Sequence, residues 1–336
     1  MADKKNIYVA YTGGTIGMKP SKDGFVPVKG HLLETIASMP EFYHDDMPEF
    51  EIFEYDPLID SANVSPKIWQ VLAIDIQTRY HDFDGFIILH GTDTMSYTAS
   101  ALSFVFENLS KPVIITGSQI PLSQLRTDAR VNLLNALYIA AYHPISEVCL
   151  FFNNRLFRGN RTTKQSADGF DAFVSPNYPI LLEAGIKIKN IAGKQQRIRN
   201  TRLNLTEIKP QSIAILHIFP GLDWAILDNL LKSPLQALLL LTYGVGNAQQ
   251  DKRLLSILKE ATDRGILIVN CSQCLKGSVN MTGYATGYAL QEAGVVSGLD
   301  MTTEAVVAKL YYLLSQRMPK KVIKELLSVD LRGELG

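Results

Sequence analysis

Short β-rich runs alternate with helical periods along most of this 336-residue chain, and that alternation constrains the fold more than any other feature. Strands that alternate with helices pair in parallel, because each crossover helix returns the chain to the same edge of the sheet. The first half predicts strands over 7–11, 50–55, 85–90, 112–116 and 147–152. Helices are predicted between them over 65–80, 96–109 and 127–142, the first of which opens with a serine and a proline at its start.

A polar and basic stretch near 186–211 interrupts this rhythm, and we interpret it as a linker that can hold a hairpin. The alternation then restarts, with strands predicted over 212–219, 237–243 and 265–270 and helices over 224–232, 250–264, 303–317 and 320–328. We therefore expect an α/β protein of two domains. A larger flavodoxin/Rossmann-like sheet domain covers 1–190, a linker covers 191–210, and a smaller parallel α/β domain covers 211–336.

Charge and hydropathy exclude several classes of protein. Lys and Arg total 33 and Asp and Glu total 33, so the chain lacks the basic excess that nucleic-acid binding requires. The longest apolar runs fall well short of the ~20 residues that a membrane span needs. The apolar stretch behind Lys4 and Lys5 is also shorter than the apolar core of about 7–15 residues in a secretion signal. We therefore expect a cytoplasmic protein with no nucleic-acid or membrane partner.

The three cysteines do not predict a disulfide framework, because their number is odd and low. Cys271 and Cys274 have C-x-x-C spacing, but a zinc site would need a second pair of ligands nearby, and the sequence offers none. A redox motif stays open as an alternative. We favour the simpler interpretation of two small residues that follow a buried strand.

Hydroxyl, carboxylate and amine side chains follow the carboxyl ends of the predicted strands, where parallel sheets bind ligands. The residues that this places on one rim are Thr15, Asp60, Ser61, Thr92, Asp93, Ser118 and, further along the chain, Lys164. Such groups suit proton transfer on a small polar substrate. Thr15 lies at the tip of a glycine-rich turn whose backbone can approach a small ligand closely.

Cofactor and histidine chemistry fit the sequence poorly. Thr12 occupies the first glycine position of a dinucleotide-binding turn, and no Gly-Lys-Ser/Thr follows as in a phosphate-binding loop. We therefore expect no cofactor. His90 lies at a strand end and is interpreted as a packed side chain rather than as a catalytic base. A hydroxyl nucleophile would then need a lysine or a tyrosine to take its proton.

Two motifs carry a resemblance to a known family: YTGGTIG at 11–17 and LHGTDTM at 89–95. Further matching stretches are GSQIP at 117–121, FFNNR at 151–155, RGNRTTK at 158–164, YGVGN at 243–247 and GYATG at 283–287. Together they resemble the bacterial-type L-asparaginase family, and most of all its cytoplasmic type I branch. The resemblance covers nearly the whole chain.

The resemblance implies hydrolysis of the side-chain amide of L-asparagine to aspartate and ammonia through an acyl-enzyme on a threonine. Thr15 matches that nucleophile, and Thr92 matches a second essential threonine that forms a hydrogen-bonded trio with Asp93 and Lys164. The substrate-binding positions implied are Asp60, Ser61, Thr92, Asp93 and Ser118. It also implies that the enzyme needs no metal or organic cofactor and works as a homodimer or as a tetramer made of two dimers.

Two positions depart from the family pattern. Phe25 stands where the mobile loop of the family usually carries a tyrosine that assists the nucleophile, and Leu241 stands where allosterically activated type I members place an arginine. Selectivity between asparagine and glutamine stays open, because one extra methylene is discriminated by only ~1–3 kcal/mol.

Two other functions stay open as alternatives. One is a non-catalytic amino-acid sensor. The other is a component of a tRNA-dependent amidotransferase, although such proteins carry an N-terminal extension that we do not expect here, because the first predicted strand begins at residue 7.

Overall fold

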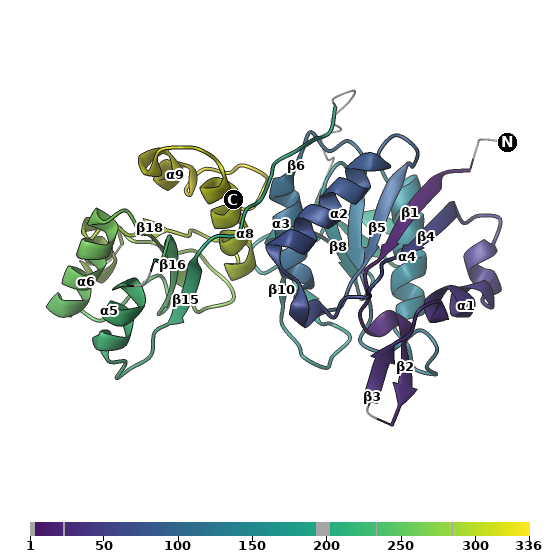
Figure 1. Cartoon of the computed structure of the whole chain (residues 1–336), viewed down its shortest axis with the longest axis horizontal. Coiled ribbons are helices and arrows are strands. Elements are labelled where there is room, and N and C mark those ends of the chain that lie inside the picture. The colour runs from purple at the N-terminus through teal and green to yellow at the C-terminus, as the bar shows by residue number, and fades with distance from the viewer. Residues whose placement is uncertain (1–3, 23, 193–201, 233, 284) are drawn as a thin grey trace. The chain divides into compact units, whose positions relative to one another are not determined.

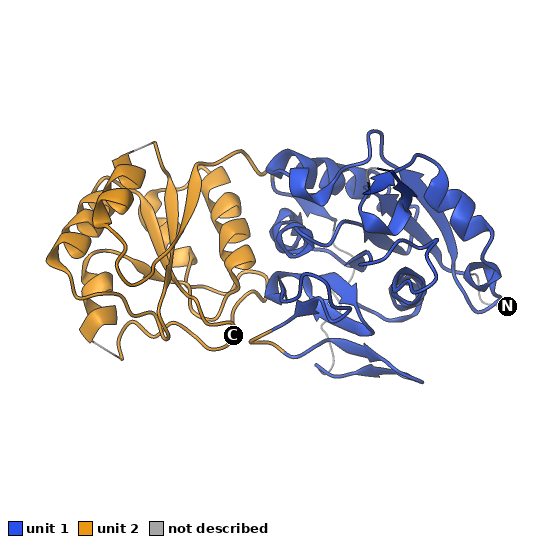
Figure 2. Cartoon of the chain, turned by 90° about the horizontal axis from the view of Figure 1, so that it is seen from below, with its two compact units in different colours: residues 1–175, 179–206 blue, residues 176–178, 207–336 orange. Residues whose placement is uncertain are grey.

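The computed structural model describes residues 4–22, 24–192, 202–232, 234–283 and 285–336, and it divides the chain into two compact units (Figures 1 and 2). Unit 1 comprises residues 1–175 and 179–206, and unit 2 comprises residues 176–178 and 207–336. Residues 193–201, which belong to the predicted linker, lie outside the described residues.

Unit 1 is built on an eight-stranded sheet with the order β13-β12-β9-β8-β7-β5-β1-β4. Its five parallel strands are β1 (Asn6–Tyr11), β4 (Glu49–Glu54), β5 (Gly85–Leu89), β7 (Val113–Thr116) and β8 (Val148–Phe152). Each lies within one residue of its predicted bounds. The remaining three strands are antiparallel: β9 (Arg155–Arg158), β12 (Leu182–Ala184) and β13 (Ile188–Asn190).

Three helices cover this sheet: α2 (Pro66–Thr78), α3 (Met95–Val105) and α4 (Ala129–Tyr142). In Figure 1, α2 and α3 lie side by side on one face and α4 lies on the other. α2 forms because Pro66 supplies a suitable φ at its first turn, and its buried residues Trp69, Leu72, Ala73 and Ile76 recur at helical spacing.

The predicted helix over 96–109 is too long. α3 ends at Val105, and the chain continues as β6 (Phe106–Glu107), which pairs with β14 (Asn204–Leu205). Asn108 then has a positive φ of 62°, a backbone conformation that no α-helix contains.

Smaller elements of unit 1 were not predicted. They are the hairpin of β2 (Met18–Ser21) and β3 (Gly24–Pro27), helix α1 (His31–Ala37), the pair β10 (Thr163–Lys164) and β11 (Phe173–Val174), and the 3-10 turns η1 (Thr15–Gly17), η2 (Pro40–Tyr43), η3 (Ser61–Asn63) and η4 (Gly159–Arg161).

Unit 2 has a parallel four-stranded sheet in the order β15-β16-β17-β18. Its strands are β15 (Ile213–His217), β16 (Ala237–Thr242), β17 (Leu267–Ser272) and β18 (Val296–Ser297). Its helices are α5 (Trp224–Lys232), α6 (Lys252–Asp263), α7 (Ala285–Glu292), α8 (Thr303–Ser315) and α9 (Lys320–Leu326). The predicted fold class, a larger sheet domain followed by a smaller parallel α/β domain, is confirmed, although α7 and β18 were not predicted.

A buried ion pair closes the C-terminal end of unit 2. Lys309 on α8 and Glu334 both have fully buried side chains, and Lys309 Nζ lies 2.6 Å from Glu334 Oε1. Lys309 also donates to the carbonyl oxygens of Leu327 and Val329. Burial lowers the pKa of Lys309, and although burial alone would raise the pKa of Glu334, the charge of Lys309 holds it below its ordinary value. This pair anchors the last residues of the chain to α8.

Candidate active site

The strand order of unit 1 puts two predicted site segments at one crevice. The chain runs from β1 to β4 on one side and then returns to β5 on the other side of β1, so the strand order reverses at the boundary of β1 and β5. Parallel sheets bind ligands at such a switch point, beyond the carboxyl ends of the strands. The turn that carries Thr15 follows β1, and the turn that carries Thr92 follows β5.

Glycines let these turns touch. A Cβ built on Gly14 would lie 2.5 Å from the main-chain nitrogen of Gly91, and one on Gly13 would lie 2.3 Å from the carbonyl oxygen of Ile59. Both glycines have positive φ angles, of 87° and 132°. Because Gly14 precedes Thr15 and Gly91 precedes Thr92, this backbone contact brings the two threonine-bearing turns together.

Lys164 forms the predicted trio with Thr92 and Asp93. Its Nζ donates to Thr92 Oγ1 at 2.9 Å and to Asp93 Oδ1 at 2.7 Å. Thr92 is 7% exposed, and the side chain of Lys164 is 18% exposed, whereas that of Asp93 is 66% exposed. The amine is therefore largely shielded from solvent, and the carboxylate stays accessible to a ligand.

Asp60 and Ser61 lie at the start of η3, next to the same turns. Asp60 Oδ1 accepts a hydrogen bond from the N–H of Ala62, so its carboxylate caps this short helix. Ser61 is 4% exposed, and a Cβ on Gly91 would lie 2.5 Å from Ser61 Oγ. Thr94 Oγ1 in turn donates to the carbonyl oxygen of Ser61. These contacts fix Ser61 directly over the turn that leads to Thr92.

Ser118 lies in the turn after β7 and is 1% exposed, and its hydroxyl donates to the carbonyl oxygen of Ile120 at 2.7 Å. This hydrogen bond makes Ser118 a brace of its own turn, and contact of Ser118 with substrate stays a prediction.

The neighbouring Gln119, which the sequence did not single out, contacts the trio directly. Thr92 Oγ1 donates to Gln119 Oε1 at 3.1 Å. The sequence signal that could have identified Gln119 is its position after β7, because the carboxyl end of β7 lies at the same edge of the sheet as those of β1 and β5.

His90 is a packed side chain, as predicted. Its Nδ1 lies 2.7 Å from the carbonyl oxygen of Gly91, and its Nε2 lies 2.9 Å from Thr98 Oγ1, which also accepts from Trp69 Nε1. A carbonyl only accepts, so Nδ1 carries the proton and Nε2 accepts from Thr98. Burial lowers the pKa of His90 below its ordinary value of 6.5, which keeps the ring neutral.

Phe25, which stands where the family usually carries a tyrosine, and Tyr11, which lies four residues before Thr15, occupy different environments. Phe25 lies on β3 and is half-exposed, so the hairpin presents an apolar ring at this position. The hydroxyl of Tyr11 is buried beneath Gly17. Burial, with a smaller contribution from Glu54, raises the pKa of Tyr11, so its phenol keeps its proton at neutral pH.

The structure does not support redox or metal chemistry at the cysteines. Burial raises the pKa of Cys271 to about 12, so its thiol stays protonated, while Cys274 is exposed. Within the described residues, no group of three or more His, Cys, Asp or Glu side chains is arranged to hold a metal ion.

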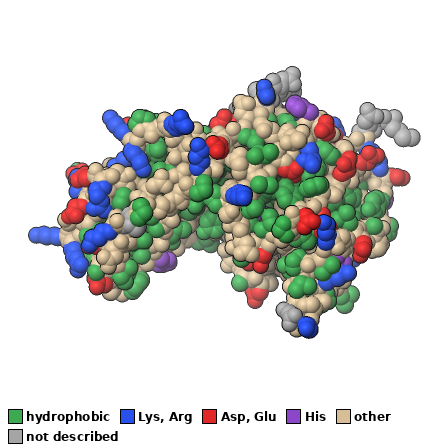
Figure 3. All heavy atoms as spheres, in the orientation of Figure 1, with side chains coloured by type: hydrophobic (Ala, Val, Ile, Leu, Met, Phe, Trp, Pro, Cys, Tyr) green, Lys and Arg blue, Asp and Glu red, His purple; other side chains and the backbone are tan. Residues whose placement is uncertain are grey.

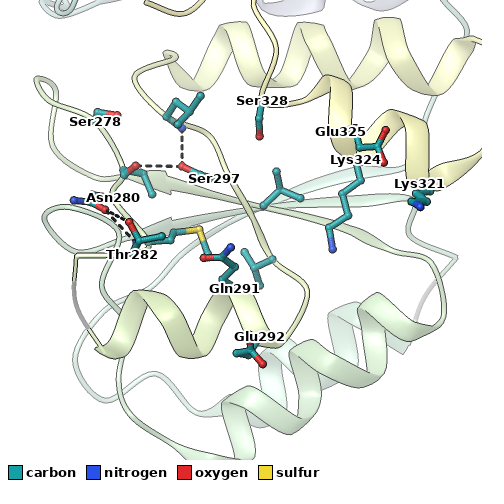
Figure 4. Close-up of a pocket in the computed structure, with 15 residues that line it drawn as sticks. Ser278, Asn280, Thr282, Gln291, Glu292, Ser297, Lys321, Lys324, Glu325 and Ser328 are labelled. Atoms are coloured by element: carbon teal, nitrogen blue, oxygen red, sulfur yellow. Dashed lines mark hydrogen bonds between the residues drawn. The ribbon is translucent and has the colours of Figure 1, made fainter.

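A separate hollow of about 1050 Å³ lies in unit 2, between β18, the end of α7 and α9 (Figure 4). Its apolar lining comes from valines, Met281 and Leu299, and its charged lining residues are two acidic and two basic ones: Glu292, Glu325, Lys321 and Lys324. The residues predicted for the active site do not line it.

The surface agrees with the balanced composition. On the face of unit 1 drawn in Figure 3, acidic and basic side chains are interspersed. Among the helices that the structure describes, none has the length and apolar character that crossing a membrane requires.

Comparison with known proteins identifies the family to which the chain belongs. Residues 6–197 match the family model "Asparaginase, N-terminal", and residues 212–327 match "Glutaminase/Asparaginase C-terminal domain". The chain is 58% identical to L-asparaginase 1 of Escherichia coli over 332 residues, which cover 99% of this chain and 98% of that protein.

A solved structure of L-asparaginase I from Vibrio cholerae superposes with a TM-score of 0.94 at 52% identity, covering 99% of this chain and all of that one. A component of the glutamyl-tRNA(Gln) amidotransferase of Methanopyrus kandleri is 30% identical over 98% of this chain and 75% of its own length. The chain therefore belongs to the asparaginase family.

Proposed function

We propose that this protein hydrolyses the side-chain amide of L-asparagine to L-aspartate and ammonia, with Thr15 as the nucleophile. The observation that carries the proposal is the hydrogen-bonded trio of Thr92, Asp93 and Lys164 at the switch point of unit 1, where the turn that carries Thr15 contacts the turn that carries Thr92. The 58% identity to L-asparaginase 1 supports asparagine as the substrate.

The first half of the reaction is an acyl transfer. Thr15 Oγ attacks the amide carbon of the substrate and loses its proton, and the carbon–nitrogen bond then breaks to release ammonia, which carries that proton away. The developing oxyanion needs N–H donors, and the N–H groups of Thr15 and Ile16 at the start of η1 can supply them, because neither has an acceptor within this short helix. Each such donor stabilises the transition state by roughly 3–4 kcal/mol.

In the second half, water attacks the carbonyl carbon of the aspartyl ester, and the bond from that carbon to Thr15 Oγ1 breaks. A proton from the water returns to Thr15 as aspartate leaves. Lys164 carries ammonium protons that it donates to Thr92 and Asp93, so the trio is a connected set of groups able to move a proton across the site. The exposed carboxylate of Asp93 suits the α-ammonium group of the substrate. The Asp60–Ser61 turn suits the same ammonium group together with the α-carboxylate of the substrate.

Ammonia release by the purified chain tests the proposal. We expect turnover of asparagine, with Thr15→Val and Thr92→Val each lowering kcat by at least about a thousandfold while the circular dichroism spectrum stays native. Tight binding of asparagine without ammonia release would favour a sensor. Turnover only in the presence of a partner chain and tRNA would favour a role within an amidotransferase.

We further propose that the protein is cytoplasmic and forms a homodimer or a tetramer made of two dimers. Both expectations rest on the resemblance to the cytoplasmic type I branch that the motifs at 11–17 and 89–95 carry. Sedimentation velocity and cell fractionation test them directly.

A further inference from the structure

Gln119 makes hydrogen bonds at both ends of its side-chain amide. Its Nε2 donates to the carbonyl oxygens of Ala167 at 3.3 Å and Gly169 at 3.1 Å, and its Oε1 accepts from Thr92 Oγ1 at 3.1 Å. Two carbonyl oxygens can only accept, so the NH₂ group of Gln119 must face them and its oxygen must face Thr92. The orientation of the amide is thereby fixed.

That orientation fixes the hydroxyl proton of Thr92. An amide oxygen cannot donate, so the single proton of Thr92 Oγ1 points to Gln119. The ammonium of Lys164 donates to the same oxygen at 2.9 Å. The hydrogen bonds therefore run in one direction, from Lys164 through Thr92 to Gln119, and one lone pair of Thr92 Oγ1 is left for the reacting groups.

The main chain of Gln119 is also held. Its N–H donates to both carboxylate oxygens of Asp128, at 3.1 and 3.0 Å, and Asp128 also accepts from the N–H of Ile120. Asp128 immediately precedes α4, and Asn132 on that helix donates to the carbonyl oxygen of Gly117. The turn that presents Gln119 is thus anchored to a helix.

The two carbonyl acceptors belong to the loop that follows Lys164 and leads to β11. Gln119 therefore connects Thr92 to the segment that carries Lys164. We propose that Gln119 is a positioning residue, which sets the rotamer and the proton direction of Thr92 relative to Lys164. The change in kcat that this inference predicts rests on the proposed function, whereas the change in the Thr92 rotamer rests on the hydrogen-bond geometry alone.

Three variants separate this role from simple support of the loop. Gln119→Met keeps the unbranched shape and removes both kinds of hydrogen bond. Gln119→Glu keeps an acceptor for Thr92 and cannot donate to the loop. Gln165→Met is the matched control, because Gln165 Nε2 donates to the carbonyl oxygen of Asp171 in the same loop and Gln165 is exposed.

We expect Gln119→Met to lower kcat for asparagine about tenfold, the effect of one lost neutral hydrogen bond, with KM within about threefold of wild type. Gln119→Glu should retain more of kcat than Gln119→Met, and Gln165→Met should stay within about twofold of wild type. Equal losses in the Met and Glu variants of Gln119, or an equal loss in Gln165→Met, would show that loop support alone matters and would overturn the proposal.

Crystal structures of the same variants give a readout that needs no turnover. Thr92 should occupy more than one side-chain rotamer in Gln119→Met and a single rotamer in Gln165→Met. If wild type releases no ammonia but these rotamers differ as expected, the proposed function fails and the positioning role stands. If Thr92 keeps its single rotamer and its contact with Lys164 in Gln119→Met, the positioning role fails whatever the activity.

Discussion

Replacement of Gly14 by alanine tests whether the contact between the two threonine-bearing turns matters for catalysis. The added Cβ would lie 2.5 Å from Gly91 N, whereas an ordinary contact is about 3.5 Å, so the turns must separate by about 1 Å. A misplacement of that size costs about a hundredfold in rate, and we expect kcat/KM for asparagine to fall by about that factor.

Stability should fall as well. Gly14 has φ 87° and ψ 173°, a conformation that costs other residues about 1–3 kcal/mol, and overpacking adds about 1–3 kcal/mol. Gly265 is the matched control, because its φ is also 87° and a Cβ there would meet nothing within 4 Å.

Ammonia release and urea unfolding measure the two effects in both variants. Gly265→Ala should lose stability through its backbone while it keeps wild-type kcat/KM. The reasoning is wrong if Gly14→Ala keeps kcat/KM within about threefold of wild type, or if Gly265→Ala loses activity to the same extent.

Two further predictions concern stability. Lys309→Met should lower the free energy of unfolding by about 3–5 kcal/mol, because it leaves Glu334 buried without its cation. Urea unfolding should show that adding Glu334→Leu recovers much of that loss. A double variant as unstable as the single one would contradict this. Burial lowers the pKa of His90 in the folded protein, so below pH 6.5 the unfolded ring takes up a proton that the folded ring does not. The contribution of His90 to the free energy of unfolding is therefore fully present above pH 6.5 and is lost as the pH falls below that value. At pH values below 6.5, the free energy of unfolding should therefore decrease more steeply in wild type than in His90→Gln, by up to about 1.4 kcal/mol per pH unit. Identical pH profiles for the two proteins would refute this.

The sequence predicted the parts of the fold that depend on local pattern. The five parallel strands of unit 1 are apolar runs bounded by turns, so their bounds could be assigned within one residue. Their carboxyl ends in turn predicted where Thr15, Thr92 and Asp93 would lie. β18 could not be predicted, because a strand of two residues is too short to show a hydrophobic pattern and forms only by pairing with β17.

The supporting contacts of the site could not be predicted in the same way. Gln119 contacts Thr92 from 27 positions away and the loop after Lys164 from about 50, and no local pattern encodes such a meeting. The contact of Gly14 with Gly91 likewise appears only once the turns after β1 and β5 are placed side by side. Lys309 lies within an otherwise apolar stretch of α8, so its burial follows from the return of the C-terminal segment carrying Glu334.

Rapid-quench mass spectrometry during turnover of asparagine tests the central claim most directly. We predict that the peptide containing Thr15 transiently gains the mass of one aspartyl group, and that the adduct is missing in Thr15→Val. An aspartyl group found on another residue, or full turnover by Thr15→Val, would contradict the account.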